Sequence, residues 1–135
     1  MNETIPVSVV IITKNEATRI RECLESVRWA SEIVVLDDHS LDETTAIAKE
    51  YTDKVFERVM DVEGRHRNYA YRLASNDWIL SLDADERVTP ELKNELVELF
   101  KKGPACNGYA IPRKNFMGNV WVRHGGMYPS AQLKL

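Results

Sequence analysis

The sequence is poor in cysteine, with Cys23 and Cys106 far apart in a chain of 135 residues. This number and spacing exclude a disulfide framework and a Cys-x-x-Cys zinc site, and they are typical of a reducing cytoplasm. The sequence also lacks an apolar run as long as a membrane span. Near the N-terminus, Glu3 and Pro6 stand where a signal peptide would have a basic patch and an apolar core. We therefore expect a cytoplasmic location.

The sequence also lacks an excess of positive charge, with 18 Lys and Arg against 21 Asp and Glu. The net charge is −3 at pH 7, which argues against a protein that binds nucleic acid through bulk electrostatics. His39, His66 and His124 lack the spacing of zinc ligands. The sequence contains neither internal repeats nor low-complexity linkers. Its length and its ordinary apolar content of 44% indicate one globular domain with a real core.

Apolar strands alternate with amphipathic helices over the first 103 residues. Strands are predicted at residues 7–13, 32–36, 54–59 and 78–82. Helices are predicted around residues 20–27, 40–51, 64–74 and 90–102. The nearly continuous β-branched run 7–13 is typical of a central parallel strand. The alternation predicts an α/β fold, with a doubly wound, mostly parallel sheet and flanking helices.

Local signals predict where the helices begin and which faces they bury. Ser40 and Glu43 have the spacing of a capping box. Thr89 and Pro90 are typical of an N-cap and a first helical residue. The residues predicted to face inward from helix 64–74 are Tyr69, Ala70, Leu73 and Ala74. Those predicted to face inward from helix 90–102 are Leu92, Leu96, Leu99 and Phe100.

The pattern changes after residue 103. Strands are predicted at 108–112 and 120–123, with a turn near Gly118 between them. Residues 131–135 have the pattern of a strand that has only begun when the chain stops. We therefore expect one domain, made of an α/β core at 1–103 and a truncated β region at 104–135.

Two carboxylates, Asp83 and Asp85, directly follow the apolar strand 78–82. Carboxylates this close together repel each other, which raises the pKa of each. A divalent cation between them removes this repulsion. Mg²⁺ and Mn²⁺ accept carboxylate oxygens and leave positions for water and phosphate oxygens. The pattern is typical either of a metal–diphosphate site at the carboxyl edge of a parallel sheet or of a solvated acidic turn before a helix.

Polar side chains also follow the first two predicted strands. Segment 13–16 ends the first strand, and Asp37 and Asp38 end the second. Because parallel strands end at the same edge of a sheet, we expect these residues to lie with Asp83 and Asp85. The segment could flank a nucleotide base, and an aspartate could accept from a base N–H or from ribose hydroxyls. The alternative for Asp37 and Asp38 is a turn whose charge favours a helix N-terminus.

A basic cluster, Arg65, His66, Arg67 and Arg72, interrupts this acidic chain. An arginine suits a diphosphate or a pyrimidine carbonyl, because its planar fork donates parallel hydrogen bonds. Arg67, near the start of a predicted helix, is the member that we assign to such a site. The alternative is a solvated basic helix face.

Taken together, these residues resemble the N-terminal half of a family-2 glycosyltransferase with the GT-A fold. The resemblance is carried by the runs VSVVIITKNE, EIVVLDDHSLDET and GRHRNYAYRLASNDWILSLDADE. The tail, GYAIPRKNFMGNVWVRHGGMYPSAQLKL, is similar to the bacterial branch that includes lipopolysaccharide core β-glucosyltransferases and related cell-envelope enzymes. The resemblance covers nearly the whole chain in the expected order. It implies that residues 1–103 bind a nucleotide sugar and that 104–135 begin the acceptor side.

The resemblance implies an inverting, metal-dependent transfer of a sugar from a UDP-sugar donor. Glucose is the sugar suggested by the tail, and the acceptor would be a lipid-linked saccharide or lipopolysaccharide core. The enzyme would act in the cytoplasm and would not bind nucleic acid. Peripheral association with the inner face of the plasma membrane and homo-oligomerisation are open alternatives.

The same resemblance implies a set of site residues. The nucleotide-sugar site would consist of Thr13, Asn15, Glu16, Asp37, Asp38, Arg67 and Asp83. Either Asp37 or Asp38 would contact the uracil, Asp83 would reach the ribose, and Asp85 with Asp83 would hold Mn²⁺ or Mg²⁺. The bound cation would neutralise the charge that builds on the departing UDP.

The sequence departs from the commoner family pattern at several positions, and one of these is Met127, which stands where an aromatic residue is usual. His39 and Glu43 stand where glycine is usual, and Leu41 stands where threonine is usual. An inverting displacement also needs a carboxylate that takes the proton of the acceptor hydroxyl. In the family this base lies downstream, so we expect it beyond Leu135. The chain alone would then bind nucleotide and metal but transfer sugar poorly.

Three other readings of the carboxylates are considered. Haloacid-dehalogenase phosphatases have Asp-x-Asp after a strand, but their pattern favours Thr or Val where Arg87 stands, and their motif usually opens the fold. A receiver domain has similar acidic spacing, but its fold has no strand that corresponds to the predicted strand 7–13. A non-catalytic nucleotide-binding or interaction module is the third alternative.

Overall fold

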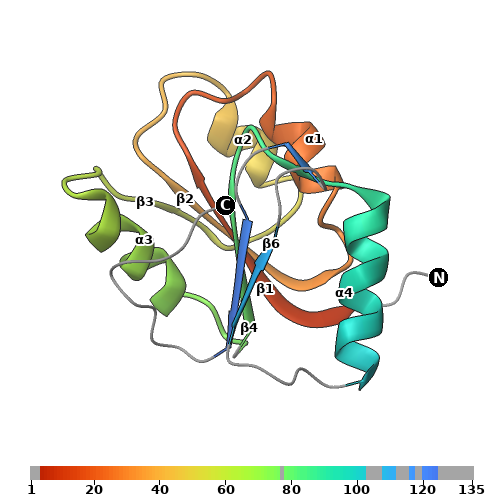
Figure 1. Cartoon of the computed structure of the whole chain (residues 1–135). Helices are drawn as coiled ribbons and strands as arrows, with labels where there is room; N and C mark the ends of the chain where they lie inside the picture. The colour runs from red at the N-terminus through yellow and green to blue at the C-terminus, as the bar shows by residue number, and fades with distance from the viewer. Residues whose placement is uncertain (1–3, 77, 103–107, 112–115, 118–119, 125–135) are drawn as a thin grey trace.

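The computed structural model describes residues 4–76, 78–102, 108–111, 116–117 and 120–124. In them, six strands form one sheet in the order β3-β2-β1-β4-β8-β6, and two short strands form a second sheet (Figure 1). The main sheet consists of β1 Ile5–Thr13, β2 Ala30–Asp37, β3 Val55–Glu57, β4 Trp78–Asp83, β6 Gly108–Ile111 and β8 Val120–His124. The short pair is β5 Arg87–Val88 and β7 Phe116–Met117.

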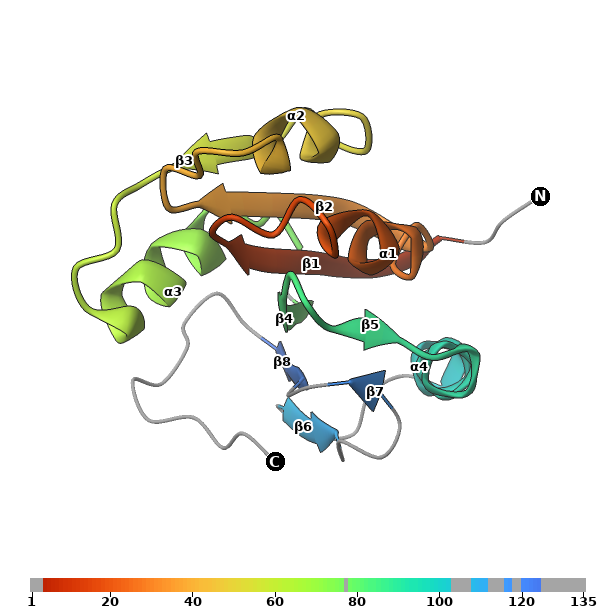
Figure 2. The ribbon, with the colours of Figure 1, turned by 90° about the horizontal axis from the view of Figure 1, so that it is seen from above.

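The helices cover both faces of the main sheet. They are α1 Ile20–Glu25, α2 Thr44–Ala48, α3 Glu63–Arg72 and α4 Pro90–Lys102. Buried residues of α1, α2 and α4 join one hydrophobic cluster, and those of α3 join another. Along β1, Val9 and Ile11 belong to the first cluster and Val10 to the second, because successive strand residues point to opposite faces. The chain therefore forms three layers, and Figure 2 shows the strands in order from β3 to β6.

The sheet is mostly parallel, as predicted. Strands β1 to β4 run parallel to one another, whereas β8 pairs antiparallel with β4 and β6 pairs antiparallel with β8. Thr13 pairs with Asp37, and Ile12 pairs with Asp83. This register brings the polar ends of β1, β2 and β4 to one edge of the sheet. The expected α/β fold with flanking helices is confirmed.

Most predicted elements are present, and some are shorter than predicted. Strand β3 and helix α2 are each shorter than the segments predicted for them. Thr89 caps α4 as predicted, since its Oγ1 accepts the N–H of Leu92 at 3.1 Å. Leu92 and Leu96 are buried as predicted, and Leu99 and Phe100 are partly buried against the same cluster.

Two local predictions are wrong. The capping box at Ser40 and Glu43 does not form: Glu43 is the N-cap of α2 and makes no side-chain cap hydrogen bond, while Ser40 bonds to Asp37 instead. In α3, Tyr69 is exposed, and Tyr71 is buried in its place. The other three predictions for this helix are confirmed, since Ala70 is buried and Leu73 and Ala74 are partly buried against the same cluster. His66 and Arg67, which were not predicted to be buried, are buried as well.

Some predictions lie outside the described residues. These are the helix stop at residues 103–104, the turn near residue 118 and the strand expected to begin at 131. Among the residues that the structure describes, no helix combines the length and apolarity that crossing a membrane requires.

Candidate functional site

The polar ends of β1, β2 and β4 surround a cavity of about 280 Å³. Its lining consists of Ile12, Thr13, Lys14, Glu16, Asp38, Met60, Arg67, Asp83, Ala84 and Asp85. Asp38 and Asp85, which are far apart in the sequence, thus face the same cavity. Of the residues predicted for the site, Asn15 and Asp37 are not in this lining.

Asp37 and Asp38 differ in their surroundings. Asp37 is fully buried, and its carboxylate accepts the N–H of Ser40 at 2.7 Å and the Ser40 hydroxyl at 2.5 Å. Asp38 faces the cavity, where its Oδ2 lies 3.7 Å from Lys14 Nζ. Its Oδ1 accepts the N–H of Met60 at 3.0 Å. Asp37 therefore shapes the loop after β2, and Asp38 presents a carboxylate to the cavity.

Asn15 belongs to the frame that supports the cavity. Its backbone N–H donates to Ser40 Oγ at 2.7 Å, and its Oδ1 accepts the N–H of Leu41 at 2.7 Å. These bonds join the loop after β1 to the loop after β2. Asn15 and His39 both adopt positive φ, of 52° and 46°. Glycine would adopt this conformation without steric cost, whereas a residue with a Cβ adopts it less readily.

Arg67, which is buried, and Asp83, which is partly exposed, form an ion pair in the lining of the cavity. Arg67 is 7% exposed, its Nη2 donates to Asp83 Oδ1 at 2.8 Å, and its Nη1 donates to Ser81 Oγ at 3.3 Å. The Tyr71 hydroxyl donates to the same Ser81 oxygen at 2.9 Å. Helix α3 and strand β4 therefore hold one guanidinium and one carboxylate in fixed positions. The sequence pattern had selected both residues.

Glu86 is a supporting residue to which the sequence analysis gave no role. It is 3% exposed, and its Oε1 accepts the N–H of Asp83 at 2.7 Å. This bond closes the turn that carries Asp83 and Asp85. A glutamate three residues after an aspartate that ends a strand is the sequence signal that could have indicated it.

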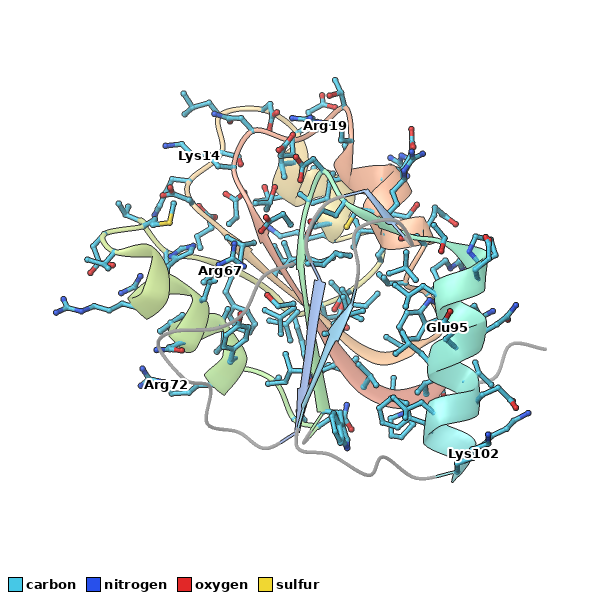
Figure 3. The ribbon with its side chains drawn as sticks, viewed as in Figure 1. Lys14, Arg19, Arg67, Arg72, Glu95 and Lys102 are labelled. Atoms are coloured by element: carbon cyan, nitrogen blue, oxygen red, sulfur yellow. The ribbon has the colours of Figure 1, made fainter. Side chains whose placement is uncertain are left out.

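Arg19 is a second residue that the sequence analysis missed. Its Nη2 lies 2.6 Å from Glu16 Oε1, and its Nη1 lies 3.9 Å from Asp85 Oδ2. The Asp85 side chain is 46% exposed, so this carboxylate is open to solvent at the mouth of the site. Figure 3 shows Lys14, Arg19 and Arg67 near the same edge of the molecule. The spacing of Glu16 and Arg19 would have predicted their ion pair, but nothing local points to Asp85.

The donor set at this edge fits a hard divalent cation. Four carboxylates, from Glu16, Asp38, Asp83 and Asp85, line the cavity together with Lys14 and Arg67. In the described part of the chain, no group of three or more His, Cys, Asp or Glu residues is arranged to hold a metal. A pair of carboxylates such as Asp83 and Asp85 can supply only part of a coordination shell. Mg²⁺ is typically bound in this way, by few carboxylates together with water and phosphate oxygens.

Three further groups near the site are buried. The Thr13 hydroxyl lacks a hydrogen-bond partner within the described residues, although Thr13 is 4% exposed and lines the cavity. Burial, followed by the nearby Arg58 charge, lowers the pKa of His66. Burial also raises the pKa of the Cys23 thiol. Cys23 is therefore a protonated thiol, and its Sγ donates to the carbonyl of Asp83 at 3.8 Å rather than acting as a nucleophile.

A larger cavity, of about 940 Å³, lies at the opposite edge of the sheet. Its buried carboxylate, Glu32, accepts hydrogen bonds from Ser8, Lys54 and Ser75. Because the hydrogen-bonding capacity of these groups is used within the network, we interpret this edge as structural. We assign the functional site to the smaller cavity, whose lining includes Thr13, with a buried hydroxyl, and Asp85, with a half-exposed carboxylate.

Comparison with protein families matches residues 8–134 to the model of glycosyl transferase family 2. A Rickettsia felis glycosyltransferase, described as uncharacterized, is 40% identical over 95 residues, which are 70% of this chain and 34% of that protein. The lipopolysaccharide core biosynthesis glycosyltransferase LpsC of Rhizobium meliloti is 29% identical over 119 residues, which are 84% of this chain and 44% of that protein. The chain spans less than half the length of these relatives.

Solved structures of other proteins are similar to the structure of this chain as well. S. aureus TarS 1–349 in complex with UDP-GlcNAc has a TM-score of 0.56 and 27% sequence identity, covering 73% of this chain and 32% of that one. The mannosyltransferase PcManGT from Pyrobaculum calidifontis, in complex with GDP-Man and Mn²⁺, has a TM-score of 0.62 and 21% identity. It covers 78% of this chain and 34% of that one, and at this identity the likeness shows the fold alone.

Proposed function

Because the chain belongs to glycosyl transferase family 2 and has its GT-A fold, we propose that it binds a UDP-sugar donor for an inverting transfer to a cell-envelope acceptor. The observation that carries the proposal is the convergence of Asp38, Arg67, Asp83 and Asp85 on one cavity. Membership of the family removes the phosphatase and receiver alternatives. The UDP-sugar complex of TarS supports UDP as the nucleotide carrier.

The residues at the cavity are suited to the parts of a uridine diphosphate. Asp38 offers a carboxylate oxygen to the uracil N–H, and the buried Thr13 hydroxyl offers a hydrogen bond that the described residues do not use. Glu16 lines the same cavity, and Asn15 joins the loop that carries Glu16 to the loop after β2. Asp83, held in place by Arg67, is suited to accept from ribose hydroxyls. These assignments are proposals about this chain's own residues.

Asp83 and Asp85 would hold a divalent cation, Mn²⁺ or Mg²⁺. When bound, the cation supplies Lewis-acid stabilisation of the charge on the departing UDP. Glu86 holds the turn that carries both carboxylates, and Arg67 orients Asp83. The complex of PcManGT with Mn²⁺ supports the use of such a cation within this fold.

The acceptor half of the reaction is proposed to depend on residues outside this chain. We propose that the general base lies beyond Leu135 and that residues 104–135 begin the acceptor-side region. The lipopolysaccharide role of LpsC supports a lipopolysaccharide core or another lipid-linked saccharide as the acceptor. Glucose as the sugar and a cytoplasmic location are carried over from the sequence resemblance. The purified chain is expected to bind donor but to transfer sugar poorly.

The test is calorimetric titration of UDP with and without Mn²⁺. We expect Asp85→Asn to weaken Mn²⁺-dependent UDP binding by about tenfold or more, because a charge-assisted contact worth ~1.5–3 kcal/mol is lost. Asp53→Asn is the matched control, since Asp53 is an exposed aspartate at the opposite edge of the sheet. It should bind like the wild type. Equal affinity for all three proteins would contradict the metal role, and no heat with UDP would favour a non-catalytic module.

A further inference from the structure

Arg19 connects two carboxylates that line the candidate cavity from different loops. Its Nε and Nη2 both lie against Oε1 of Glu16, at 2.9 and 2.6 Å, and its Nη1 lies 3.9 Å from Oδ2 of Asp85. Glu16 belongs to the loop after β1, and Asp85 belongs to the turn after β4. The guanidinium thus spans the rim of the cavity, although Arg19 itself is outside its lining (Figure 3).

The two ends of this bridge differ in strength. Glu16 is fixed, because its backbone N–H donates to Thr44 Oγ1 at 2.9 Å and its carbonyl accepts the N–H of Ile20 at 2.8 Å. Its side chain is 18% exposed, whereas that of Asp85 is 46% exposed. At 3.9 Å the contact with Asp85 is longer than a hydrogen bond, and exposed ion pairs contribute little stability. Arg19 can therefore leave Asp85 while it remains on Glu16.

The Asp85 carboxylate beside Arg19 is also one of the two proposed to hold the divalent cation. A cation at this carboxylate would meet the positive guanidinium, and the two would repel each other. A cation that binds alone must therefore displace Arg19 without giving its charge another partner. If the cation carries a diphosphate, the phosphate oxygens are ligands of the same ion and so lie beside Asp85. A guanidinium suits them, since its planar fork donates parallel hydrogen bonds to phosphate oxygens.

We propose that Arg19 couples cation binding to diphosphate binding. In the chain without ligands, its guanidinium neutralises part of the charge on Asp85 and so weakens the binding of a cation alone. When cation and diphosphate bind together, the guanidinium stays on Glu16 and transfers its other end from Asp85 to the diphosphate. Because coupling free energies are reciprocal, the cation strengthens UDP binding by the same factor by which UDP strengthens cation binding. This inference rests on the proposed function, since it requires the cation and the nucleotide at this cavity.

The test is removal of the guanidinium in Arg19→Gln, with Mn²⁺ binding and UDP binding measured separately on the 135-residue chain. Mn²⁺ alone, followed by electron paramagnetic resonance of the free ion, should bind about threefold to fivefold more tightly, because its competitor at Asp85 is gone. UDP with Mn²⁺, followed by calorimetric titration, should bind about tenfold more weakly, because a charge-assisted contact is lost. Since Mn²⁺ should bind the UDP complex with unchanged affinity, the factor by which Mn²⁺ strengthens UDP binding should fall by about threefold to fivefold.

Arg87→Gln is the matched control for the loss of a positive charge. Arg87 follows the same turn, and its side chain is 50% exposed. Its Nη1 lies 2.5 Å from Oε2 of Glu22 in α1, a carboxylate outside the cavity lining, so this variant should bind Mn²⁺ and UDP like the wild type. In a second control, Arg19→Gln with Asp85→Asn should bind Mn²⁺ no more tightly than Asp85→Asn alone, because the gain requires the Asp85 carboxylate.

Uridine binding separates this role of Arg19 from a merely structural one. If Arg19 only held Glu16 in place, Arg19→Gln would disturb the proposed nucleotide side of the cavity and would weaken uridine binding as well. Under the coupling proposal, uridine should bind the variant and the wild type equally, because uridine has no phosphate groups. NMR titration of both proteins with uridine measures this.

Three results would overturn the coupling proposal. They are unchanged or weaker Mn²⁺ binding in Arg19→Gln, an equal gain in Arg87→Gln, and an equal loss of uridine and UDP binding in Arg19→Gln. In each of these cases, Mn²⁺-dependent UDP binding by the wild type would still support the proposed function. If the wild type did not bind UDP, the proposed function itself would be wrong, and the coupling with it.

Discussion

The two adjacent aspartates at the end of β2 have separate tasks. Asp37 has no exposed surface and accepts two hydrogen bonds from Ser40. Asp38 is 8% exposed and lines the cavity beside Lys14. A buried carboxylate whose oxygens are occupied contributes to stability, whereas one that faces a cavity is available to a ligand. The direction of each side chain, rather than its chemistry, separates the two roles.

This difference can be tested with paired alanine variants. We expect Asp37→Ala to lower the free energy of unfolding by about 1–2 kcal/mol, because it leaves two half-buried donors of Ser40 without their acceptor. We expect Asp38→Ala to destabilise the fold less and to weaken UDP binding by about tenfold. Urea denaturation and calorimetric titration of both variants check the two effects. If Asp37→Ala were stable but defective in UDP binding, the separate roles given to Asp37 and Asp38 would be wrong.

Among the elements, α3 and α4 show when a sequence pattern predicts the buried face of a helix. Helix α4 buries Leu92 and Leu96, as the spacing of its apolar residues predicts. Helix α3 buries Ala70 as predicted, but it also buries His66 and Arg67, which a pattern of apolar residues assigns to solvent. Arg67 tolerates burial because Asp83 and Ser81 accept its hydrogen bonds. A helix that contributes a charged residue to a site therefore departs from the apolar pattern.

The N-cap of α4 provides a prediction at the level of the element. Thr89→Ala should lower the free energy of unfolding by about 1 kcal/mol, because the N–H of Leu92 loses its acceptor. For a domain of this size, that corresponds to a fall in Tm of about 4 °C. Thermal unfolding followed by circular dichroism measures it. Thr18→Ala is the control, since Thr18 is exposed and precedes α1, and an equal loss there would remove the capping explanation.

At the scale of the whole molecule, Glu32 joins separate parts of the fold. Its carboxylate, near the start of β2, accepts hydrogen bonds from Ser8 in β1, from Lys54 before β3 and from Ser75 before β4. Burial alone would raise the pKa of Glu32, but these hydrogen bonds outweigh it and lower the pKa to about 2. The ionised carboxylate is therefore stabilised only when the chain is folded.

The lowered pKa of Glu32 predicts how stability depends on pH. Its contribution, on the order of 3 kcal/mol, is fully present above the unfolded-state pKa of about 4.5 and is lost as the pH falls toward 2. Glu32→Gln should therefore lower stability at pH 7 and flatten the acid dependence between these values. Urea denaturation across this pH range checks it. Glu95→Gln, at an exposed residue of α4, should follow the wild-type curve, and an unchanged slope in Glu32→Gln would contradict the prediction.

Much of the fold and part of the site could be predicted from local sequence. The β-branched run of β1 and the apolar run of β4 identify central strands, because burial on both faces excludes polar residues. Parallel pairing then places Asp38 and Asp83 at one edge without any knowledge of side-chain positions. The predictions failed where the partner of a side chain is distant in sequence. Arg19 is 66 residues from Asp85, and no local pattern relates the two.

The sequence by itself determined the α/β architecture, the family and the edge of the sheet where the carboxylates end. These follow from hydrophobic periodicity and strand direction, which are properties of contiguous residues. Only the tertiary structure decided that Asp37 faces the loop and Asp38 the cavity, that Glu86 holds the metal-binding turn proposed here, and that Arg67 is buried. The reason is physical: a hydrogen bond needs two groups at short distance and in the right direction, and folding alone sets both.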